Sequence, residues 1–283
     1  MLLENNELII DSKISGGELT RIYSKKYNKE ILWNRDKKHW GRHSPILFPI
    51  VGKLQNDQTI IEKKSYKMTQ HGFARDFDFT LENKNENSIT YSLKSSDETK
   101  KFYPYDFKLS LSYTLIDNKI EVNWKVENID NKEIQFAIGA HPAFNITDIN
   151  DCYLEFESKK QVSQIIMKPP YHDNKIDINI DKLDLTPKTF EGDALIYTNV
   201  DSINVKNKNE EDYLKISFDN FPLVGVWTPF YKEENSTAPF LCIEPWYGIC
   251  DNINSNGNYK DKEFINTLNI KETFNVSYFI EII

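Results

Sequence analysis

Three ionisable residues occupy similar apolar surroundings in this chain, and their types suit proton transfer. His71 lies in the segment QHGFAR, His141 in GAHPAF and Glu244 in LCIEPWYGICD. Each follows an apolar or small run and neighbours Gly or Pro, so we expect each side chain to project from a strand end into a cleft. Two histidines and one glutamate provide two proton donors and one proton acceptor, which is the inventory of general acid–base catalysis.

His141 belongs to the stretch 136–145, which reads FAIGAHPAFN. Pro142 has a fixed φ and no N–H, so it ends strand pairing and favours an extended backbone at His141. The sequence therefore predicts an imidazole that is held rigidly at the end of a strand. The alternative interpretation is a histidine that caps the strand and has its hydrogen bonds satisfied there.

Glu244 comes directly after the apolar run 241–243. A carboxylate in that position loses hydration, which raises its pKa and makes it a better base. Pro245 and Trp246 then offer a rigid turn and an aromatic face on which the C–H face of a sugar could stack. The alternative is a glutamate that forms a salt bridge at the end of a strand.

Other catalytic motifs are missing from the sequence. It contains no serine-centred elbow, phosphate-cradling glycine loop, dinucleotide fingerprint or histidine pair with metal-binding spacing. His39 and His43 are close in sequence, in the segment HWGRH, but they match no metal site. We expect these two histidines to take part in the packing of their own loop.

Composition narrows the classes of protein that fit the chain. With 39% hydrophobic and 13% aromatic residues, the 283 residues can bury a sizeable core and are not disordered. The net charge of -8 argues against nucleic acid or an anionic membrane as the main partner. No apolar run is long enough to span a membrane and no basic secretory leader is present, so we expect a cytoplasmic protein. The cysteines match no disulfide framework or zinc motif, which agrees with a reducing compartment: Cys152, Cys242 and Cys250.

Alternating apolar and polar residues recur along the whole chain, whereas long helical periodicity is nearly absent. The clearest hairpin joins Leu109–Ile116 to Lys119–Glu127, and a long strand is predicted at Phe274–Ile282. No repeat or break in composition divides the chain. We therefore predict one all-β domain of many antiparallel strands over residues 1–283.

Three segments depart from the strand pattern. Residues 39–57 combine prolines, glycines, histidines and cations, so we expect an ordered loop that lines a site. Residues 169–182 are rich in Asp, Asn and Lys after a Pro-Pro pair, which predicts a surface excursion. The segment Asn207–Asp212 reads as a charged turn.

The order of the motifs HGFAR, GAHPAFN and IEPWYGICDN resembles the aldose 1-epimerase (galactose mutarotase) superfamily. The segments SPILFPIVGKLQND and FEGDALIY are most similar to the LacX-like branch, and the resemblance covers essentially the whole chain. It implies a large antiparallel β-sandwich of the galactose mutarotase-like supersandwich type, with an open sugar-binding cleft. It also implies catalysis without a metal or a nucleotide cofactor.

The resemblance assigns a role to each of the three ionisable residues. Glu244 matches the general base that removes the proton from the C1 hydroxyl of the sugar. His141 matches the general acid that protonates the ring oxygen, and His71 matches the histidine that binds and polarises the same region. Opening of the ring, rotation about C1–C2 and closure from the other face would then give the other anomer.

Further substrate contacts follow from the resemblance less directly. Asp193, in EGDALIY, matches an acidic residue that hydrogen-bonds sugar hydroxyls, although it could equally be a turn residue. Asn56 lies where galactose mutarotases carry an Asn-Arg pair, but Asp57 replaces the arginine here, which departs from a galactose-type binding mode. Among the tryptophans, we expect Trp246 to stack on the sugar.

Two arginines leave the nature of the sugar open. Hexose-6-phosphate 1-epimerases of the same superfamily carry arginines at the positions that Arg42 and Arg75 occupy here, where two guanidinium groups would bind a phosphate bidentately. Alternatively, Arg75 pairs with Asp76 or Asp78 and Arg42 faces solvent.

Four hypotheses about function remain at this point. The leading one is an aldose 1-epimerase that acts on a free aldohexose. The others are a sugar-phosphate epimerase, a carbohydrate-binding protein that lacks catalysis, and a lyase or isomerase that uses this fold on another sugar. In each case the expected partner is a small-molecule sugar, and the protein would be a monomer or a homodimer.

Overall fold

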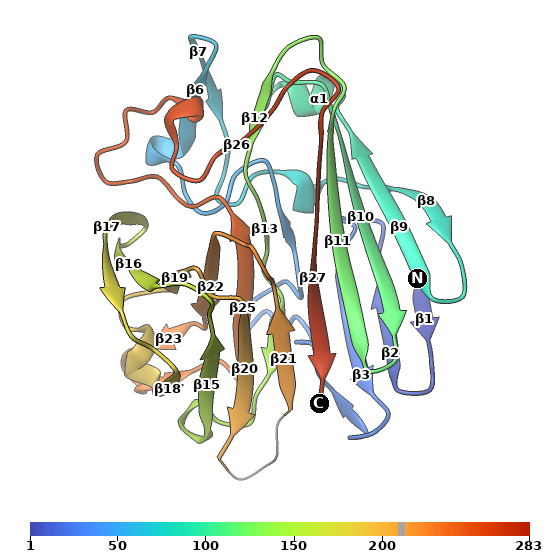
Figure 1. The fold of residues 1–283 in the computed structure, drawn as a ribbon, viewed down its shortest axis with the longest axis vertical. Coiled ribbons are helices and arrows are strands. Elements are labelled where there is room, and N and C mark those ends of the chain that lie inside the picture. The colour runs from blue at the N-terminus through green and yellow to red at the C-terminus, as the bar shows by residue number, and fades with distance from the viewer. Residues whose placement is uncertain (209–212) are drawn as a thin grey trace.

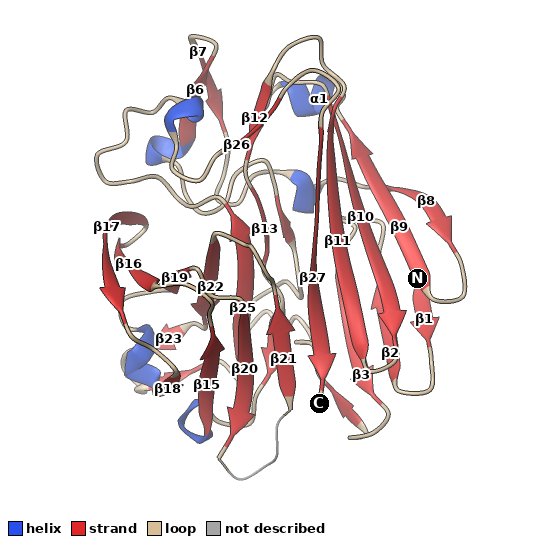
Figure 2. Ribbon diagram, in the orientation of Figure 1, coloured by secondary structure: helices blue, strands red, loops and turns tan. Residues whose placement is uncertain are grey.

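The computed structural model describes residues 1–208 and 213–283, and Figures 1 and 2 show that strands dominate it. Two large sheets pack face to face, and all pairings between their strands are antiparallel. The helices are short and lie at the edges of the sheets. None of the helices in the described part of the chain has the length and apolar character that a membrane span requires. The predicted large antiparallel β-sandwich is therefore confirmed.

The first large sheet contains the longest strands. Its central hairpin forms because inward-facing apolar residues alternate with outward-facing polar ones, and because Asp117 adopts the positive φ of 51° that a tight two-residue turn needs. Nine strands within the described residues form this sheet, in the order β18 (Lys182–Asp184), β15 (Cys152–Glu157), β20 (Ser202–Asn207), β21 (Leu214–Ser217), β27 (Thr273–Ile282), β11 (Lys119–Asn128), β10 (Phe107–Ile116), β9 (Ser88–Lys94) and β8 (Thr80–Lys84).

The second large sheet is shorter and more irregular. Eight strands of the described chain belong to it, because β14 pairs with β25 outside the main order. That order is β17 (Tyr171–Ile178), β16 (Val162–Lys168), β19 (Leu195–Thr198), β22 (Leu223–Trp227), β25 (Phe240–Tyr247), β13 (Ile138–Ala140) and β5 (Ile46–Leu47), with β14 at Ala143–Asn145.

Smaller elements complete the fold. A four-stranded sheet, β1 to β4, packs beside the first large sheet, and three two-strand ladders connect loops. Helix α1 begins with a capping box between Ser96 and Thr99. These elements are β1 (Leu2–Glu4), β2 (Leu8–Ser12), β3 (Leu19–Ser24), β4 (Lys29–Glu30), β6 (Gln58–Ile61), β7 (Lys64–Lys67), β12 (Ile134–Phe136), β23 (Phe230–Tyr231), β24 (Ser236–Thr237), β26 (Asn266–Leu268), α1 (Asp97–Lys100) and the 3₁₀ helices η1 (Gln55–Asp57), η2 (Ala74–Asp76), η3 (Ile149–Asp151), η4 (Pro187–Phe190) and η5 (Tyr259–Asp261).

Strand β25 shows how the two faces of the second sheet differ. Its residues Leu241 and Ile243 belong to the main core between the sheets. The alternate residues Cys242, Glu244 and Trp246 therefore lie on the opposite face, because successive side chains of a strand point to opposite sides. Almost all of β25 is buried, so its outer face must be covered by other parts of the chain.

Most sequence-based expectations for the elements are confirmed. The hairpin of β10 and β11 and the long final strand β27 have nearly the predicted bounds. The segment predicted as a surface excursion at 169–182 is mostly exposed, but Tyr171–Ile178 forms the edge strand β17, which pairs with β16 and was not predicted. Of the charged turn predicted at Asn207–Asp212, residues 209–212 lie outside the described part of the chain.

A buried ion pair ties the loop after β25 to the 3₁₀ helix η1. Lys262 Nζ donates to Asp251 Oδ1, and both side chains are only 3% exposed. The other carboxylate oxygen of Asp251 accepts from the backbone N–H of Gln55 at 2.8 Å. Removal of one partner from such a pair leaves the other charge buried without compensation.

We expect Lys262→Met to lower the free energy of unfolding by about 3–5 kcal/mol, because it leaves Asp251 buried and unpaired. Lys260→Met is the matched control, since Lys260 is exposed and the substitution should change stability by less than about 0.5 kcal/mol. Urea denaturation of both variants measures the difference. Equal stability of the two variants would show that the ion pair does not stabilise this region.

Candidate active site

A cavity of about 400 Å³ lies on the outer face of the second large sheet. Its volume falls within the range of small-molecule sites, about 300–1,000 Å³. It gathers residues from the loop at 39–57, the HGFAR segment and strands of the sheet, which confirms the expectation that the loop lines a site. Of the eight site residues predicted from the sequence, seven line this cavity: Arg42, His71, Arg75, His141, Asp193, Glu244 and Trp246.

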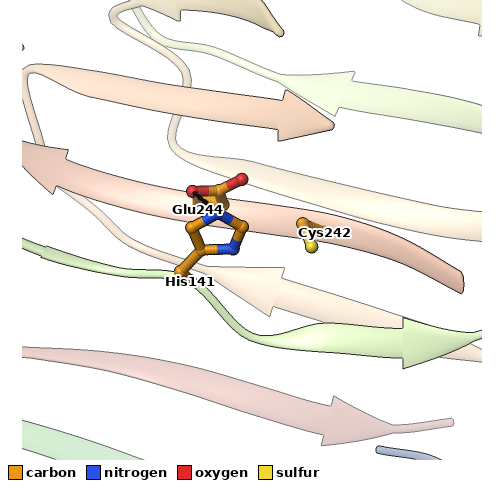
Figure 3. A group of neighbouring side chains, drawn as sticks. All are labelled: His141, Cys242 and Glu244. Carbon is orange, nitrogen blue, oxygen red and sulfur yellow. Dashed lines mark ion pairs between the residues drawn. The ribbon is translucent and has the colours of Figure 1, made fainter. Parts of the chain in front are cut away.

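The position of His141 against Glu244 follows from strand register. Strand β13 pairs Gly139 with Trp246, and β14 pairs Ala143 with Cys242. The same register continues through the His-Pro break between these two strands and places His141 directly opposite Glu244. Directly opposed residues have Cβ atoms about 4.5–5.5 Å apart, so their side chains meet. His141 Nε2 lies 3.5 Å from Glu244 Oε2 (Figure 3).

This register corrects one expectation and supports another. Glu244 does not lie at a strand end, because β25 continues through Pro245 to Tyr247. Pro245 pairs with Val224 of β22, and on its other side it lies next to the His141-Pro142 break, where pairing with β25 is interrupted and a missing N–H is tolerated. His141 does follow the end of β13, as Pro142 predicted.

The His141–Glu244 pair is buried with little hydrogen bonding. His141 is 7% exposed and Glu244 2% exposed, and Glu244 Oε2 has no hydrogen-bond partner among the described atoms. Burial lowers the pKa of His141 to about 3, and the charge of Arg75 adds to this effect. Burial raises the pKa of Glu244 well above its usual value, and the charge of Asp193 raises it further. Both shifts favour a neutral carboxylic acid that faces a neutral imidazole.

The tautomer of His71 follows from its backbone partner. The N–H of Gly52 donates to Nδ1 of His71 at 3.1 Å, and the N–H of His71 donates back to the carbonyl of Gly52 at 2.9 Å. Nδ1 is therefore an acceptor and carries no proton, so the ring is neutral and bears its hydrogen on Nε2. Burial lowers the pKa of His71 well below its usual value, with His141 next in effect. The Nε2–H of His71 is directed to the cavity, where the side-chain amide of Gln70 lies 3.3 Å from Nε2.

Gly52 is suited to this contact by its backbone. Its φ of 71° lies in the left-handed region, and a Cβ built on it would lie 2.5 Å from Cβ of Cys250. Only glycine fits between the two segments without displacing one of them. His71 itself adopts a φ of 68°, a backbone conformation that residues with a side chain adopt rarely.

The tryptophans of the cavity have different surroundings. Trp40 stacks on the ring of His141 with centroids 4.6 Å apart, and Trp227 meets the same ring edge-on at 5.6 Å. Trp246 lines the cavity but is only 5% exposed, because its indole fits against two glycines and donates to the carbonyl of Ala140. The partly exposed rings of Trp40 and Trp227 are therefore better placed to meet a ligand than Trp246, on which the sequence-based expectation rested.

Two guanidinium groups share one carboxylate at the cavity. Arg42 forms an ion pair with Asp76 at 2.7 Å, whereas Nε of Arg75 is 3.9 Å from the same side chain. The Nε of Arg75 is buried and has no hydrogen-bond partner among the described atoms, although its Nη2 donates to the carbonyl of Gln70. Burial lowers the pKa of Arg75 to about 10, and Arg42 lowers it further. This end of the cavity therefore carries a net positive charge.

Asp193 lines the same cavity and is near enough to Glu244 for its charge to act on that carboxyl group. It follows the 3₁₀ helix η4 and adopts a φ of 78°. Burial raises the pKa of Asp193, although hydrogen bonds from the Ala194 backbone and the Trp227 indole partly offset this rise. The turn role and the site role considered for this residue are both consistent with its position.

Three candidate residues lie away from the cavity lining. Asn56 is exposed, in the 3₁₀ helix η1, so the structure does not bring it to the predicted substrate site. His39 bonds to the hydroxyl of Tyr231 at 2.8 Å, and the backbone N–H of His43 donates to Glu18. Both histidines thus hold the loop in place, as expected.

Sequence reasoning missed several lining residues. Lys53 lies in the segment SPILFPIVGKLQND and Gln70 directly precedes His71, so membership of these motifs was a usable signal. Met167 and Pro170 come from the β16–β17 hairpin, whose polar sequence gave no sign that its tip reaches the cavity.

Comparison with known proteins gives a consistent result. A family model described as aldose 1-epimerase matches residues 2–261 of the chain. The protein LacX of Lactococcus lactis subsp. lactis is 32% identical over 302 aligned positions, which cover 99% of this chain and 98% of LacX. These matches confirm the resemblance that was inferred from the order of the sequence motifs.

Two solved structures are similar in fold over the whole chain. A galactose mutarotase related enzyme from Lactobacillus acidophilus has a TM-score of 0.94 and 31% identity, and the match covers 100% of this chain and 97% of that chain. A galactose mutarotase-like protein from Lactobacillus casei has a TM-score of 0.94 and 29% identity, with 100% and 99% coverage. The expected galactose mutarotase-like architecture is thereby confirmed.

The raised pKa of Glu244 yields a prediction about the free protein. Asp193→Asn removes a nearby negative charge that disfavours the Glu244 carboxylate, so the pKa of Glu244 should fall. The side-chain carboxyl ¹³C signal of Glu244 should then titrate at lower pH than in the wild type. Glu191→Gln, in the same segment but exposed, is the control and should leave the titration unchanged. An unchanged midpoint in Asp193→Asn would contradict the coupling.

Proposed function

This chain belongs to the aldose 1-epimerase family, and from that premise we propose that it is an isomerase that interconverts the α and β anomers of an aldohexose. The observation that carries the proposal is the cross-strand pair of His141 and Glu244 in a cavity that also presents the Nε2–H of His71. Anomer exchange requires one group that accepts a proton and one that donates a proton near the same hemiacetal.

The proposed reaction begins with a sugar whose C1 lies between His141 and Glu244. The Glu244 carboxylate accepts the proton of the C1 hydroxyl, and the electron pair of that O–H bond forms the aldehyde C=O. The C1–O5 bond breaks, and O5 takes a proton from His141. Rotation about C1–C2 presents the other face of the aldehyde, and reversal of the proton transfers closes the ring as the other anomer.

The reaction requires that His141 and Glu244 together hold one transferable proton. In the free protein the pKa shifts place this proton on Glu244, whereas the reaction starts with it on His141. The two arrangements are tautomers with the same net charge, so sugar hydroxyls that hydrogen-bond to the ion-pair form can shift the equilibrium without uptake or loss of a proton. Because both groups are restored when the ring closes, the protein needs no further reactant.

The other polar groups would orient the sugar. His71, as a neutral donor, can hydrogen-bond the ring oxygen or the C1 oxygen without competing for the transferred proton. Asp193 can accept hydrogen bonds from sugar hydroxyls near Glu244. The exposed parts of Trp40 and Trp227 would cover the apolar C–H face of the ring.

Glu244→Gln tests this proposal directly, because the amide keeps the size of the side chain but cannot accept the proton as a carboxylate does. We expect the rate of mutarotation of α-D-glucose or α-D-galactose, followed by polarimetry, to fall about 10²- to 10⁴-fold. Sugar binding, measured by saturation-transfer NMR, should remain.

Glu191→Gln is the matched control, since that glutamate is exposed, and its turnover should equal the wild type. Wild-type turnover in Glu244→Gln would remove the base assignment. Sugar binding by a wild-type protein that does not accelerate mutarotation would instead point to a carbohydrate-binding protein of this fold.

A second candidate function is 1-epimerisation of a sugar phosphate. The specific observation that favours it is the pair Arg42 and Arg75 at the cavity, because among the described residues both guanidinium groups form ion pairs with the same carboxylate, that of Asp76. The unpartnered, buried Nε of Arg75 leaves a donor available to an anion. Guanidinium groups bind phosphate through charge-assisted and often bidentate hydrogen bonds.

The two proposed functions predict different effects of Arg42→Gln on catalysis. If the substrate is phosphorylated, kcat/KM for glucose 6-phosphate should fall about 10- to 100-fold, since hydrogen bonds to charged groups contribute about 1.5–3 kcal/mol. The value for glucose should change little. Lys38→Gln removes an exposed cation from the same loop and is the control. Equal effects of Arg42→Gln on both sugars would exclude phosphate recognition by this residue.

A further inference from the structure

The cavity face of β25 brings a cysteine beside the proposed acid–base pair. Cys242 lies two residues before Glu244, so both side chains point to the same face of the strand. It pairs with Ala143, which lies two residues after His141, so all three side chains lie on one face of the sheet, with the Cys242 thiol to one side of the His141–Glu244 pair (Figure 3). One ligand atom from each of His141, Cys242 and Glu244 lies within 4.8 Å of the other two.

The spacing of these atoms is close to that of a metal site. Zinc binds nitrogen, oxygen and sulfur at about 2.0–2.3 Å, so two ligand atoms of a tetrahedral site are about 3.3–3.8 Å apart. Nε2 of His141 and Oε2 of Glu244 are 3.5 Å apart, which lies within this range but is too long for a good hydrogen bond. The thiol would have to approach by roughly 1 Å, which a change in a side-chain rotamer can supply.

A second observation points to a missing ligand at the same place. Oε2 of Glu244 is fully buried and has no hydrogen-bond partner among the described atoms, and the glutamate is only 2% exposed. Buried carboxylate oxygens are otherwise almost always bonded, so an atom of this kind marks a position where something else can bind. A metal ion between Glu244 and His141 would satisfy it.

We propose that His141, Cys242 and Glu244 form a binding site for Zn²⁺ or a similar thiophilic divalent ion, and that this ion excludes the sugar from the cavity. Imidazole, thiolate and carboxylate together suit Zn²⁺, and water could take the fourth position. His141 and Glu244 line the cavity, whereas Cys242 is buried in a cluster beside Phe240. The competition with sugar rests on the proposed function, whereas the metal site itself does not. Zn²⁺ would thus inhibit the enzyme by holding the acid and the base together.

The exchange of two protons for one Zn²⁺ would leave the net charge of this buried cluster unchanged. Binding of the ion releases the thiol proton of Cys242 and the carboxyl proton of Glu244 to solvent. Two protons leave and one dication enters, so the charge of the cluster does not change. Arg42 and Arg75 disfavour an additional cation in the cavity, but they have no such effect on an exchange that leaves the net charge constant.

Co²⁺ is the probe for the metal site, because it adopts the same tetrahedral geometry and a cobalt–thiolate bond gives a charge-transfer band in the near ultraviolet. The wild-type protein, first treated with a chelator, should develop this band with one equivalent of Co²⁺. Cys242→Ser should lack the band, whereas Cys250→Ser should keep it, since Cys250 lines the cavity but lies outside the cluster.

The cobalt spectrum is the first arm of the test. The second arm measures the affinity for Zn²⁺ and its competition with the sugar. Loss of even an outer partner of a metal ligand costs about 10–100-fold in affinity, so Cys242→Ser should weaken Zn²⁺ binding by at least about tenfold. Zn²⁺ should inhibit wild-type mutarotation competitively with the sugar. No Zn²⁺ binding by calorimetry, or a Co²⁺ complex whose spectrum is the same in Cys242→Ser, would overturn the metal site. Tight Zn²⁺ binding without loss of turnover would overturn the competition.

The two arms also separate the metal site from the proposed reaction. The cobalt spectrum requires no sugar, so it can be positive in a protein that does not catalyse anomer exchange. A positive spectrum with no mutarotation would leave the metal site and remove the proposed function. Mutarotation with no thiolate band would support the proposed function and remove the metal site.

Discussion

The site depends on one feature of strand register. Strands β13 and β14 pair with the same central strand, β25, on either side of the His141-Pro142 break. Because the register is kept through the break, His141 faces Glu244, and a shift by one residue would turn one of the two side chains into the core. Pro142 interrupts pairing with β25 and Pro245 has no N–H, so the sheet can open at this point without leaving a ladder N–H unpaired.

The electrostatics of the cavity follow from that placement. A carboxyl group on a buried strand, with Asp193 nearby, holds its proton, and an imidazole between tryptophan rings remains neutral. The pair therefore stores one proton that can move between two positions, as an anomer exchange would require. The backbone of Gly52 keeps His71 in a single tautomer, so that ring remains a hydrogen-bond donor while the pair exchanges its proton. Arg42 and Arg75, which line the same cavity, would set the preference between neutral and anionic sugars.

Much of this arrangement could be predicted from the sequence, because it depends on residues that are close together in the chain. Alternating patterns identified the long hairpin of β10 and β11, and Gly and Pro next to His71, His141 and Glu244 marked three residues that the fold gathers at one cavity. The contribution of the β16–β17 hairpin was not predictable, because its polar sequence reads as surface and its role depends on a tertiary contact. The exposed position of Asn56 and the packing of Trp246 beneath two glycines are likewise set by the fold, not by neighbouring residues.

The central claim is that the His141–Glu244 pair exchanges anomers, and NMR magnetisation transfer tests it most directly. Saturation of the H1 signal of the α anomer should reduce the β signal when catalytic amounts of wild-type protein are added to glucose, galactose or glucose 6-phosphate. We expect enhanced transfer for at least one of these sugars, and the sugar that responds identifies the preferred substrate class. Transfer at the uncatalysed rate for every aldohexose and hexose phosphate tested, in the presence of demonstrable sugar binding, would contradict it.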